Sequence, residues 1–187
     1  MARVLIPFTE GVEEVELVAV IDLLRRADVE VCAASLDGGA VVGRSNITIE
    51  PDAALAAVMA DDWDMVVLPG GLPNAFLLRD DANVKAVVDR LRAERKSIAA
   101  ICAAPLALAA YGITEDKRVT SYPTCQQEME KLQPSSVYVD EDVVEDDFLI
   151  TSRGPGTAIE FSLRLIAKLC GKEKSEEIRH SILHIHR

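Results

Sequence analysis

Short apolar runs alternate with longer amphipathic segments along most of this chain, and this alternation restricts the fold more than any other feature. The apolar runs are too short for helices and predict buried strands at 3–8, 30–35, 65–68 and 97–101. The segments between and after them have the length and periodicity of helices at 13–27, 84–93, 104–110 and 158–169. Strands that alternate with helices predict an α/β fold, with a mostly parallel sheet covered by helices on both faces.

Weaker signals fill the rest of the chain without changing this architecture. They predict a short helix within 51–59, a polar helix toward the C-terminus, and short strands near 40–42, 46–50, 137–139, 143–144 and 148–151. No internal repeat or linker separates these elements, and 187 residues is a usual length for one domain. We therefore expect a single domain over residues 1–187, with its functional site at the carboxyl ends of the strands.

Composition and charge exclude several classes of function. The 20 basic and 31 acidic residues give a net charge of −11, which repels phosphate backbones and disfavours nucleic-acid binding. The four cysteines form no C-x-x-C pair and have no neighbouring histidine, so we expect neither a disulfide framework nor a metal site. The longest uncharged apolar stretch, 98–111, is too short to span a bilayer. Because no signal-peptide pattern precedes the first strand, we expect a cytoplasmic protein.

Cys102 is the first candidate for a reactive group. It lies between the predicted strand 97–101 and the predicted helix 104–110, and the small residues around it permit a sharp turn like that of a nucleophile elbow. Unpaired N–H groups and the positive dipole end of the helix should lower the pKa of its thiol. An isolated cysteine is more often a small packed side chain, but its place between a strand and a helix favours a nucleophile.

Glu16 is the second candidate. On a helix over 13–27 its side chain falls within the apolar arc of that helix, whereas Glu14 points away from the arc and Glu13 complements the helix dipole. A carboxyl group that faces a core is either protonated or held by a specific partner. A purely structural hydrogen bond would explain Glu16 equally well. Because the helix follows the first strand, Glu16 should lie at the same sheet edge as Cys102.

Two glycine-containing loops complete the set of motifs. The run Leu-Pro-Gly-Gly at 68–71 ends a strand, so the N–H groups of Gly71 and Ala103 would be placed to form an oxyanion hole. The segment Thr-Ser-Arg-Gly-Pro-Gly-Thr at 151–157 leads into the last long helix, where Thr157 and Glu160 match a capping box. At this second loop, capping is favoured over phosphate binding.

Taken together, these motifs resemble the ThiJ/PfpI superfamily, in the branch that contains the parkinsonism-associated protein deglycase and bacterial YajL. The resemblance covers nearly the whole chain and rests on segments 13–16, 68–71, 99–105, 119–123 and 151–157. It implies a flavodoxin-like sandwich, a homodimer and no cofactor. It also implies that Cys102 is readily oxidised and that a protonated Glu16 donates a hydrogen bond to it.

The chain departs from the superfamily at two positions. Tyr122 stands where some members carry a histidine before the proline, and Ala103 stands where the protease-like branch carries a histidine after the cysteine. The histidines of this chain all lie near its C-terminus, at His180, His184 and His186. Without a local Cys–His pair, peptidase activity is disfavoured, and Glu16 is the evident proton carrier.

The resemblance implies an enzyme of the glyoxalase or deglycase type, acting on methylglyoxal, glyoxal or their early adducts with proteins or nucleotides, in carbonyl and oxidative stress defence. Cys102 would attack the aldehyde, and Glu16 would move the protons. A redox-sensing, chaperone-like dimer that uses the same two residues is the alternative. A glutamine amidotransferase is disfavoured because the segment 184–186 lacks the acid of the His-x-Glu pair used by that class.

Further expectations concern the surroundings of the pair and the oligomeric state. Val15 and Val18 are apolar on the face opposite the core, which supports a homodimer, with Arg26 and Arg44 near the interface. Cys32 and Cys170 are expected to pack rather than react. The residues expected around Cys102 and Glu16 are Tyr122, Gly70, Arg26 and Cys125.

Overall fold

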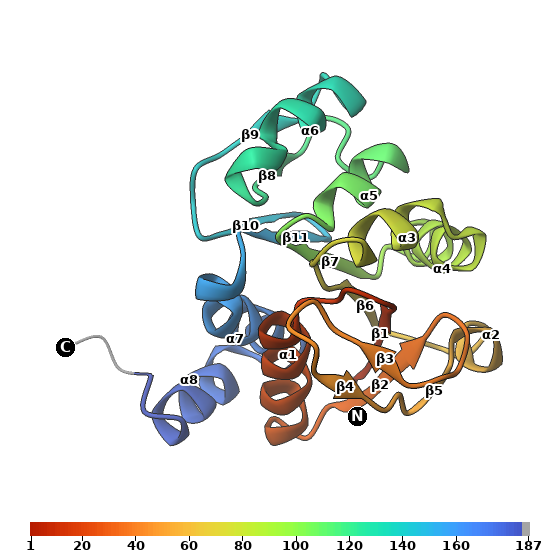
Figure 1. The fold of residues 1–187 in the computed structure, drawn as a ribbon. Coiled ribbons are helices and arrows are strands. Elements are labelled where there is room, and N and C mark those ends of the chain that lie inside the picture. The colour runs from red at the N-terminus through yellow and green to blue at the C-terminus, as the bar shows by residue number, and fades with distance from the viewer. Residues whose placement is uncertain (185–187) are drawn as a thin grey trace.

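A seven-stranded sheet forms the centre of the molecule in the computed structural model, which describes residues 1–184 (Figure 1). The strand order is β10-β11-β7-β6-β1-β2-β5. All neighbouring strands are parallel except β10 and β11, which form an antiparallel pair at one edge. The strands are β1 (Arg3–Phe8), β2 (Glu30–Ser35), β5 (Ala53–Ala54), β6 (Met65–Leu68), β7 (Ser97–Ile101), β10 (Val143–Asp146) and β11 (Leu149–Ser152).

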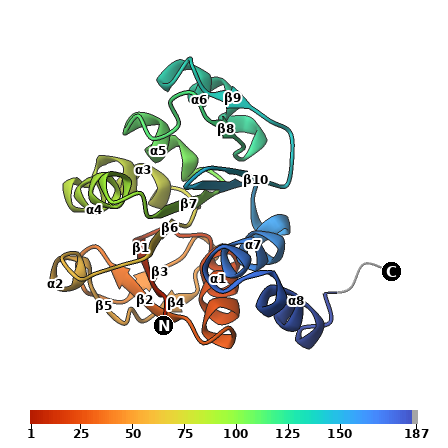
Figure 2. The ribbon, with the colours of Figure 1, turned by 180° about the vertical axis from the view of Figure 1, so that it is seen from behind.

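Helices cover both faces of this sheet (Figures 1 and 2). Along β1, Val4 and Ile6 point into one buried cluster and Leu5 points into another, because successive side chains of a strand face opposite sides. The first cluster is completed by α1 (Glu14–Arg26), α7 (Ala158–Cys170) and α8 (Lys172–Ser181). The second is completed by α2 (Leu55–Val58), α3 (Asn74–Asp80), α4 (Ala82–Ala93), α5 (Pro105–Ala110) and α6 (Gln126–Leu132).

Two small sheets and two 3₁₀ turns lie outside the central sheet. Strands β3 (Val41–Val42) and β4 (Thr48–Ile49) form an antiparallel hairpin, and β8 (Arg118–Val119) pairs in parallel with β9 (Val137–Tyr138). The 3₁₀ turns span Pro123–Cys125 and Pro155–Thr157. The turn of the β3–β4 hairpin contacts the start of α1.

This architecture confirms the predicted α/β fold with a mostly parallel sheet. The strands predicted at 3–8, 30–35, 65–68 and 97–101 have those bounds in the structure. The capping box expected from Thr157 and Glu160 is wrong. Thr157 Oγ1 donates to the Gly154 carbonyl at 2.9 Å, and Glu160 instead accepts two hydrogen bonds from the Arg179 guanidinium. Glu160 therefore binds Arg179 of α8 and does not cap α7.

Candidate functional site

Cys102 occupies the turn between β7 and α5 in an uncommon backbone conformation. Its φ is +64°, in the left-handed region that residues with a side chain rarely adopt. Both of its backbone groups are held: its N–H donates to the Ser152 carbonyl at 3.0 Å, and its carbonyl accepts from the Tyr122 N–H at 2.8 Å. Such a conformation costs on the order of 1–3 kcal/mol and persists only where the surroundings fix it. The neighbouring loops therefore hold Cys102 at an elbow, at the carboxyl end of the sheet.

Glu16 lies fully buried beside this elbow, near the start of α1. Its Oε2 accepts a hydrogen bond from the Gly70 N–H at 2.8 Å, and its carboxyl group also interacts with the Cys102 thiol. Within residues 1–184, Oε1 has no hydrogen-bond partner. Burial raises the pKa of Glu16 to about 7, and the hydrogen bonds from Cys102 and Gly70 oppose that rise only in part. The carboxyl is therefore protonated in much of the population near neutral pH.

The Cys102 thiol has the opposite pKa shift from the one expected of a helix N-terminus. Burial and the negative charge of Glu16 raise the pKa of Cys102 to about 12, and N–H groups of Gly71 and Ala103 lower it by less. The expectation of a lowered pKa is wrong because the dipole of the short helix α5 is weaker than desolvation and a neighbouring carboxylate. When the thiol proton moves to Glu16, the negative charge of the carboxylate disappears. A thiolate at Cys102 is then no longer repelled by Glu16.

The glycines of the 68–71 loop let the chain pass close to both side chains. A Cβ on Gly70 would lie 2.6 Å from the Cys102 Cβ and 2.7 Å from Glu16 Oε2. A Cβ on Gly71, whose φ is +87°, would lie 2.4 Å from the Glu13 nitrogen. The N–H groups of Gly71 and Ala103, expected to form an oxyanion hole, hydrogen-bond to the Cys102 sulfur. An anion formed at this sulfur, or on an atom bonded to it, would therefore meet two N–H donors.

The remaining candidate residues are placed differently. Tyr122 lies next to the elbow, is 43% exposed, and packs its ring against Gly154. Arg26 lies ten residues beyond Glu16, about 15 Å further along α1, where its guanidinium pairs with Asp22 at 2.9 Å. Cys125 packs against the buried cluster on the opposite face of the sheet from the cluster that Cys102 contacts. The structure therefore does not bring Arg26 to Cys102, whereas Cys125 is linked to the elbow through Tyr122, whose carbonyl accepts a hydrogen bond from the Cys125 N–H at 2.8 Å.

Two acidic residues at the start of α1 have roles that sequence reasoning missed. Glu13 is bound by Arg44 at 3.2 Å, from the hairpin turn, rather than only complementing the helix dipole. Glu14 was expected to point away from the core, but it is only 5% exposed and accepts hydrogen bonds from backbone N–H groups of the same turn. No local pattern could have revealed these contacts, because the partners lie 31 to 33 residues further along the chain.

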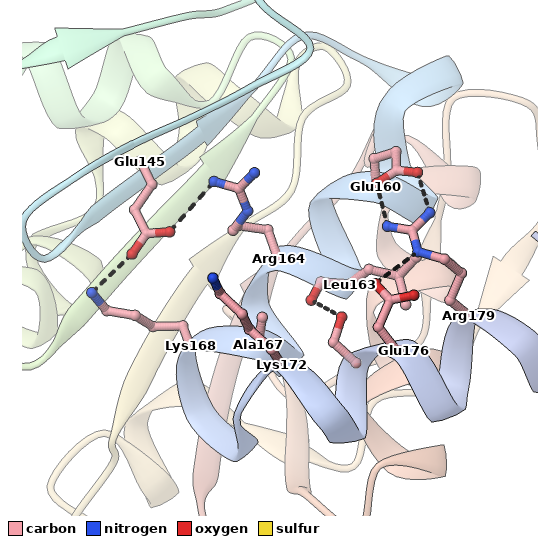
Figure 3. Close-up of a pocket in the computed structure, with 10 residues that line it drawn as sticks. Glu145, Glu160, Leu163, Arg164, Ala167, Lys168, Lys172, Glu176 and Arg179 are labelled. Carbon is pink, nitrogen blue, oxygen red and sulfur yellow. Dashed lines mark hydrogen bonds and ion pairs between the residues drawn. The ribbon is translucent and has the colours of Figure 1, made fainter. Parts of the chain in front are cut away.

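A groove elsewhere in the molecule shares no lining residue with this pair. This groove of about 650 Å³ lies between α7 and α8, and Figure 3 shows the side chains that line it. Ion pairs occupy both of its ends: Glu145 binds Lys168 at 3.0 Å, and Glu160 binds Arg179 at 2.5 Å. Cys102 does not line this groove. Among the C-terminal histidines, His184 contacts Glu160 at 2.8 Å. His186 lies outside the described residues.

Within residues 1–184 no helix is long and apolar enough to cross a bilayer. In the same residues, no group of three or more His, Cys, Asp or Glu side chains is arranged to hold a metal ion.

The fold and the site together define a flavodoxin-like α/β protein with a cysteine at a strand–helix elbow and a buried carboxyl group beside it. Residues 2–168 match the model of the DJ-1/PfpI family, and the chain belongs to this family, as the motif resemblance predicted. It is 42% identical over 183 residues to Protein dj-1beta of Drosophila melanogaster, covering 96% of this chain and 95% of that protein. It is 36% identical over 180 residues to the Glutathione-independent glyoxalase DJR-1.2 of Caenorhabditis elegans, covering 95% and 92%.

Solved structures agree with this assignment. The crystal structure of Drosophila melanogaster DJ-1beta superimposes with a TM-score of 0.93 at 41% identity, and the match covers 97% of each chain. The oxidized form of Toxoplasma gondii DJ-1 gives a TM-score of 0.92 at 34% identity, with 98% of each chain covered. Both comparisons support the flavodoxin-like arrangement of the sheet and helices described above.

Proposed function

We propose that this protein is a glutathione-independent enzyme of the glyoxalase or deglycase type, acting on small dicarbonyls such as methylglyoxal or on their early adducts. The observation that carries the proposal is the contact between the elbow thiol of Cys102 and the buried carboxyl of Glu16, whose pKa is raised to about 7. A general acid–base group is most effective when its pKa lies near the working pH. The relative named as a glutathione-independent glyoxalase supports the same class of substrate.

The first step forms a covalent bond between the protein and the substrate. The Glu16 carboxylate takes the proton of the Cys102 thiol, and the resulting thiolate attacks the aldehyde carbon of methylglyoxal. A carbon–sulfur bond forms, the carbonyl π electrons move to oxygen, and Glu16 delivers its proton to that oxygen. The N–H groups of Gly71 and Ala103, which contact the sulfur in the free protein, are close enough to stabilise the developing charge. The product of this step is a hemithioacetal.

The second step is an internal oxidation and reduction that needs no external reagent. The Glu16 carboxylate removes the proton on the former aldehyde carbon, the hydroxyl proton passes to the ketone oxygen, and Glu16 returns its proton to the neighbouring carbon. The first carbon is thereby oxidised to a thioester and the second reduced to an alcohol. Water then attacks the thioester, which breaks the carbon–sulfur bond, releases lactate and returns the thiol. Glu16 acts in turn as acid and base.

Cys102 and Glu16 are the proposed catalytic residues, Gly71 and Ala103 the proposed backbone donors, and Gly70 the residue that positions Glu16. We propose that residues 1–187 act as one domain and as a homodimer. The exposed side chains of Val15 and Val18 on α1 support a second copy at that face, near Arg26. A cytoplasmic location and a role in carbonyl and oxidative stress defence complete the proposal.

Methylglyoxal consumption without glutathione tests the proposal directly. The wild-type protein should consume the aldehyde and release lactate, and Cys102→Ser should lose this activity. Cys170→Ser is the matched control, because Cys170 is an exposed thiol at the end of α7. If the Cys102→Ser variant turns over as fast as the wild type, the proposed nucleophile is wrong.

A redox-sensing role for the same cysteine is the second candidate, and one observation favours it. The two N–H groups that contact the Cys102 sulfur, together with a protonated Glu16, offer hydrogen bonds to the oxygens of a sulfinate. Absence of methylglyoxal turnover, combined with rapid oxidation of Cys102, would favour this sensor over the enzyme.

A further inference from the structure

Glu14 is a buried carboxylate that the proposed chemistry does not use. It is the first residue of α1, it is 5% exposed, and its Oε1 accepts hydrogen bonds from the N–H groups of Ser45 at 2.7 Å and Ile47 at 3.4 Å. Within the described residues, its buried Oε2 has no hydrogen-bond partner. Burying a carboxylate with an unpaired oxygen costs stability. Glu14 lowers stability in this way and lies two residues from Glu16. It is therefore a candidate for a role in the function of the Cys102–Glu16 pair.

The turn between β3 and β4 has a shape that accommodates this carboxylate. A Cβ on Gly43 would lie 2.3 Å from Glu14 Oε1 and 2.5 Å from its carboxyl carbon. Any side chain at position 43 would therefore displace Glu14. Burial raises the pKa of Glu14, but hydrogen bonds from its own N–H group and from Ser45 and Ile47 outweigh burial and lower the pKa below its usual range. Glu14 is thus ionised at neutral pH and holds the turn as a carboxylate.

Hydrogen bonds and an ion pair also connect the β3–β4 turn to the loop that supports Cys102 and Glu16. Arg44 N–H donates to the Val12 carbonyl at 3.0 Å, and the Arg44 guanidinium binds Glu13 at 3.2 Å. Glu13 N–H donates to the Gly70 carbonyl at 3.1 Å, and the 11–13 loop packs directly against Gly71. A continuous series of contacts therefore leads from Glu14, through the turn and the 11–13 loop, to the loop that binds Glu16 and Cys102.

We propose that Glu14 is a positioning residue that clamps the β3–β4 turn onto the start of α1, and so holds Arg44 close to Glu13 and Glu16. The proposal rests on the site assigned under the proposed function. The titratable and charged groups that act on Glu16 are Cys102 from the elbow, Glu13 from the start of α1, and Arg44 from the turn. The positive charge of Arg44 lowers the pKa of Glu16. Releasing Arg44 should raise it.

The rate of Cys102 alkylation by iodoacetamide between pH 5 and 9 tests this role, because the rate reports the titration of the Cys102–Glu16 pair. In Glu14→Ala, the apparent pKa of this profile should rise by about half a pH unit, the size expected when a partly exposed charge moves away. Glu14→Gln retains one acceptor oxygen for the turn and should show a smaller rise. Glu10→Gln removes the same charge from an exposed position nearby and should leave the profile unchanged.

Gly43→Ala provides an independent perturbation that leaves every proposed catalytic group in place. It should raise the apparent pKa as Glu14→Ala does, and it should add nothing in the Glu14→Ala background, since its added methyl group acts by displacing Glu14. Circular dichroism identifies variants that fold. If Glu14→Ala does not fold, Gly43→Ala and Glu14→Gln carry the test.

Two results would overturn the proposal. One is a folded Gly43→Ala or Glu14→Ala variant with the wild-type alkylation profile. The other is a Gly43→Ala effect that persists in full when Glu14 is already alanine. Alkylation requires no carbonyl turnover, so a wild-type protein that fails to consume methylglyoxal contradicts the proposed function without affecting this test.

Discussion

Replacing Glu16 with glutamine should remove a pH-dependent loss of stability that the wild-type protein undergoes between about pH 4.5 and pH 7. Burial raises the pKa of Glu16 in the folded protein to about 7, from an ordinary value of 4.5. Below pH 4.5, both the folded and unfolded states carry the proton. As the pH rises from 4.5 to 7, the unfolded state loses its proton while the folded state keeps it, so the free energy of unfolding falls. Above pH 7 both states are ionised, and the loss is complete.

The size of this loss follows from the difference between the two pKa values. A difference of one pKa unit corresponds to about 1.4 kcal/mol, so the shift of Glu16 corresponds to a loss of about 3 kcal/mol across this pH range. Glutamine does not titrate. The free energy of unfolding of Glu16→Gln, minus that of the wild type, should therefore increase by about 3 kcal/mol between pH 4.5 and pH 8. The Cys102 thiol does not interfere, because its pKa is raised to about 12.

Urea unfolding of both proteins at pH 4.5, 5.5, 6.5 and 8, at one protein concentration, measures this difference. Taking the difference between the two proteins cancels the contributions of the other titratable groups. Glu10→Gln is the matched control, because Glu10 is exposed and its replacement should leave the pH dependence of the wild type unchanged. A difference that stays constant across this range would refute the argument that burial keeps Glu16 protonated.

Three further predictions concern the site and the assembly. Gly70→Ala should lower methylglyoxal turnover about 100-fold, measured as lactate release, because the added methyl group would displace Cys102 or Glu16. Under mild peroxide, Cys102 should oxidise before the other cysteines and stop at sulfinic acid in peptide mass spectra, because Glu16 can take the thiol proton and two N–H groups contact the sulfur. Earlier oxidation of Cys125, or a disulfide between the two, would contradict the assignment of Cys102 as the reactive cysteine. Val18→Glu should convert the proposed homodimer to a monomer in light scattering, whereas Val137→Glu, at a similarly exposed valine on β9, should not.

The central strands were predictable because their apolar runs reflect burial on both faces of a parallel sheet. Helices α3 and α6 were missed for two different reasons. Asn74, at the start of α3, follows a proline and resembles a loop residue, yet its buried amide is held by the carbonyls of Pro69 and Gly70. Helix α6 is polar and buries only Met129, so its sequence carries little amphipathic signal.

The contact between Glu16 and Cys102 was predictable from the sequence, whereas the pKa values of the two groups were not. The helix period and the sheet topology indicated that Glu16 and Cys102 meet at one sheet edge, and their side chains do interact. The direction of the pKa shift of Cys102 depends on how deeply the thiol is buried and on the charge of its neighbour. The burial of Glu14 depends on a turn more than 30 residues away. Neither quantity is encoded in local spacing.

Lactate formation from methylglyoxal without glutathione, followed by proton NMR, tests the central claim most directly when wild type and Glu16→Gln are compared. An amide cannot carry the proton between the two carbons, so Glu16→Gln should form lactate about 10²- to 10⁴-fold more slowly while Cys102 remains open to alkylation. Glu10→Gln should retain the wild-type rate. If the wild type forms no lactate above the buffer rate, or if Glu16→Gln forms it as fast as the wild type, the account of a Cys102–Glu16 enzyme is contradicted.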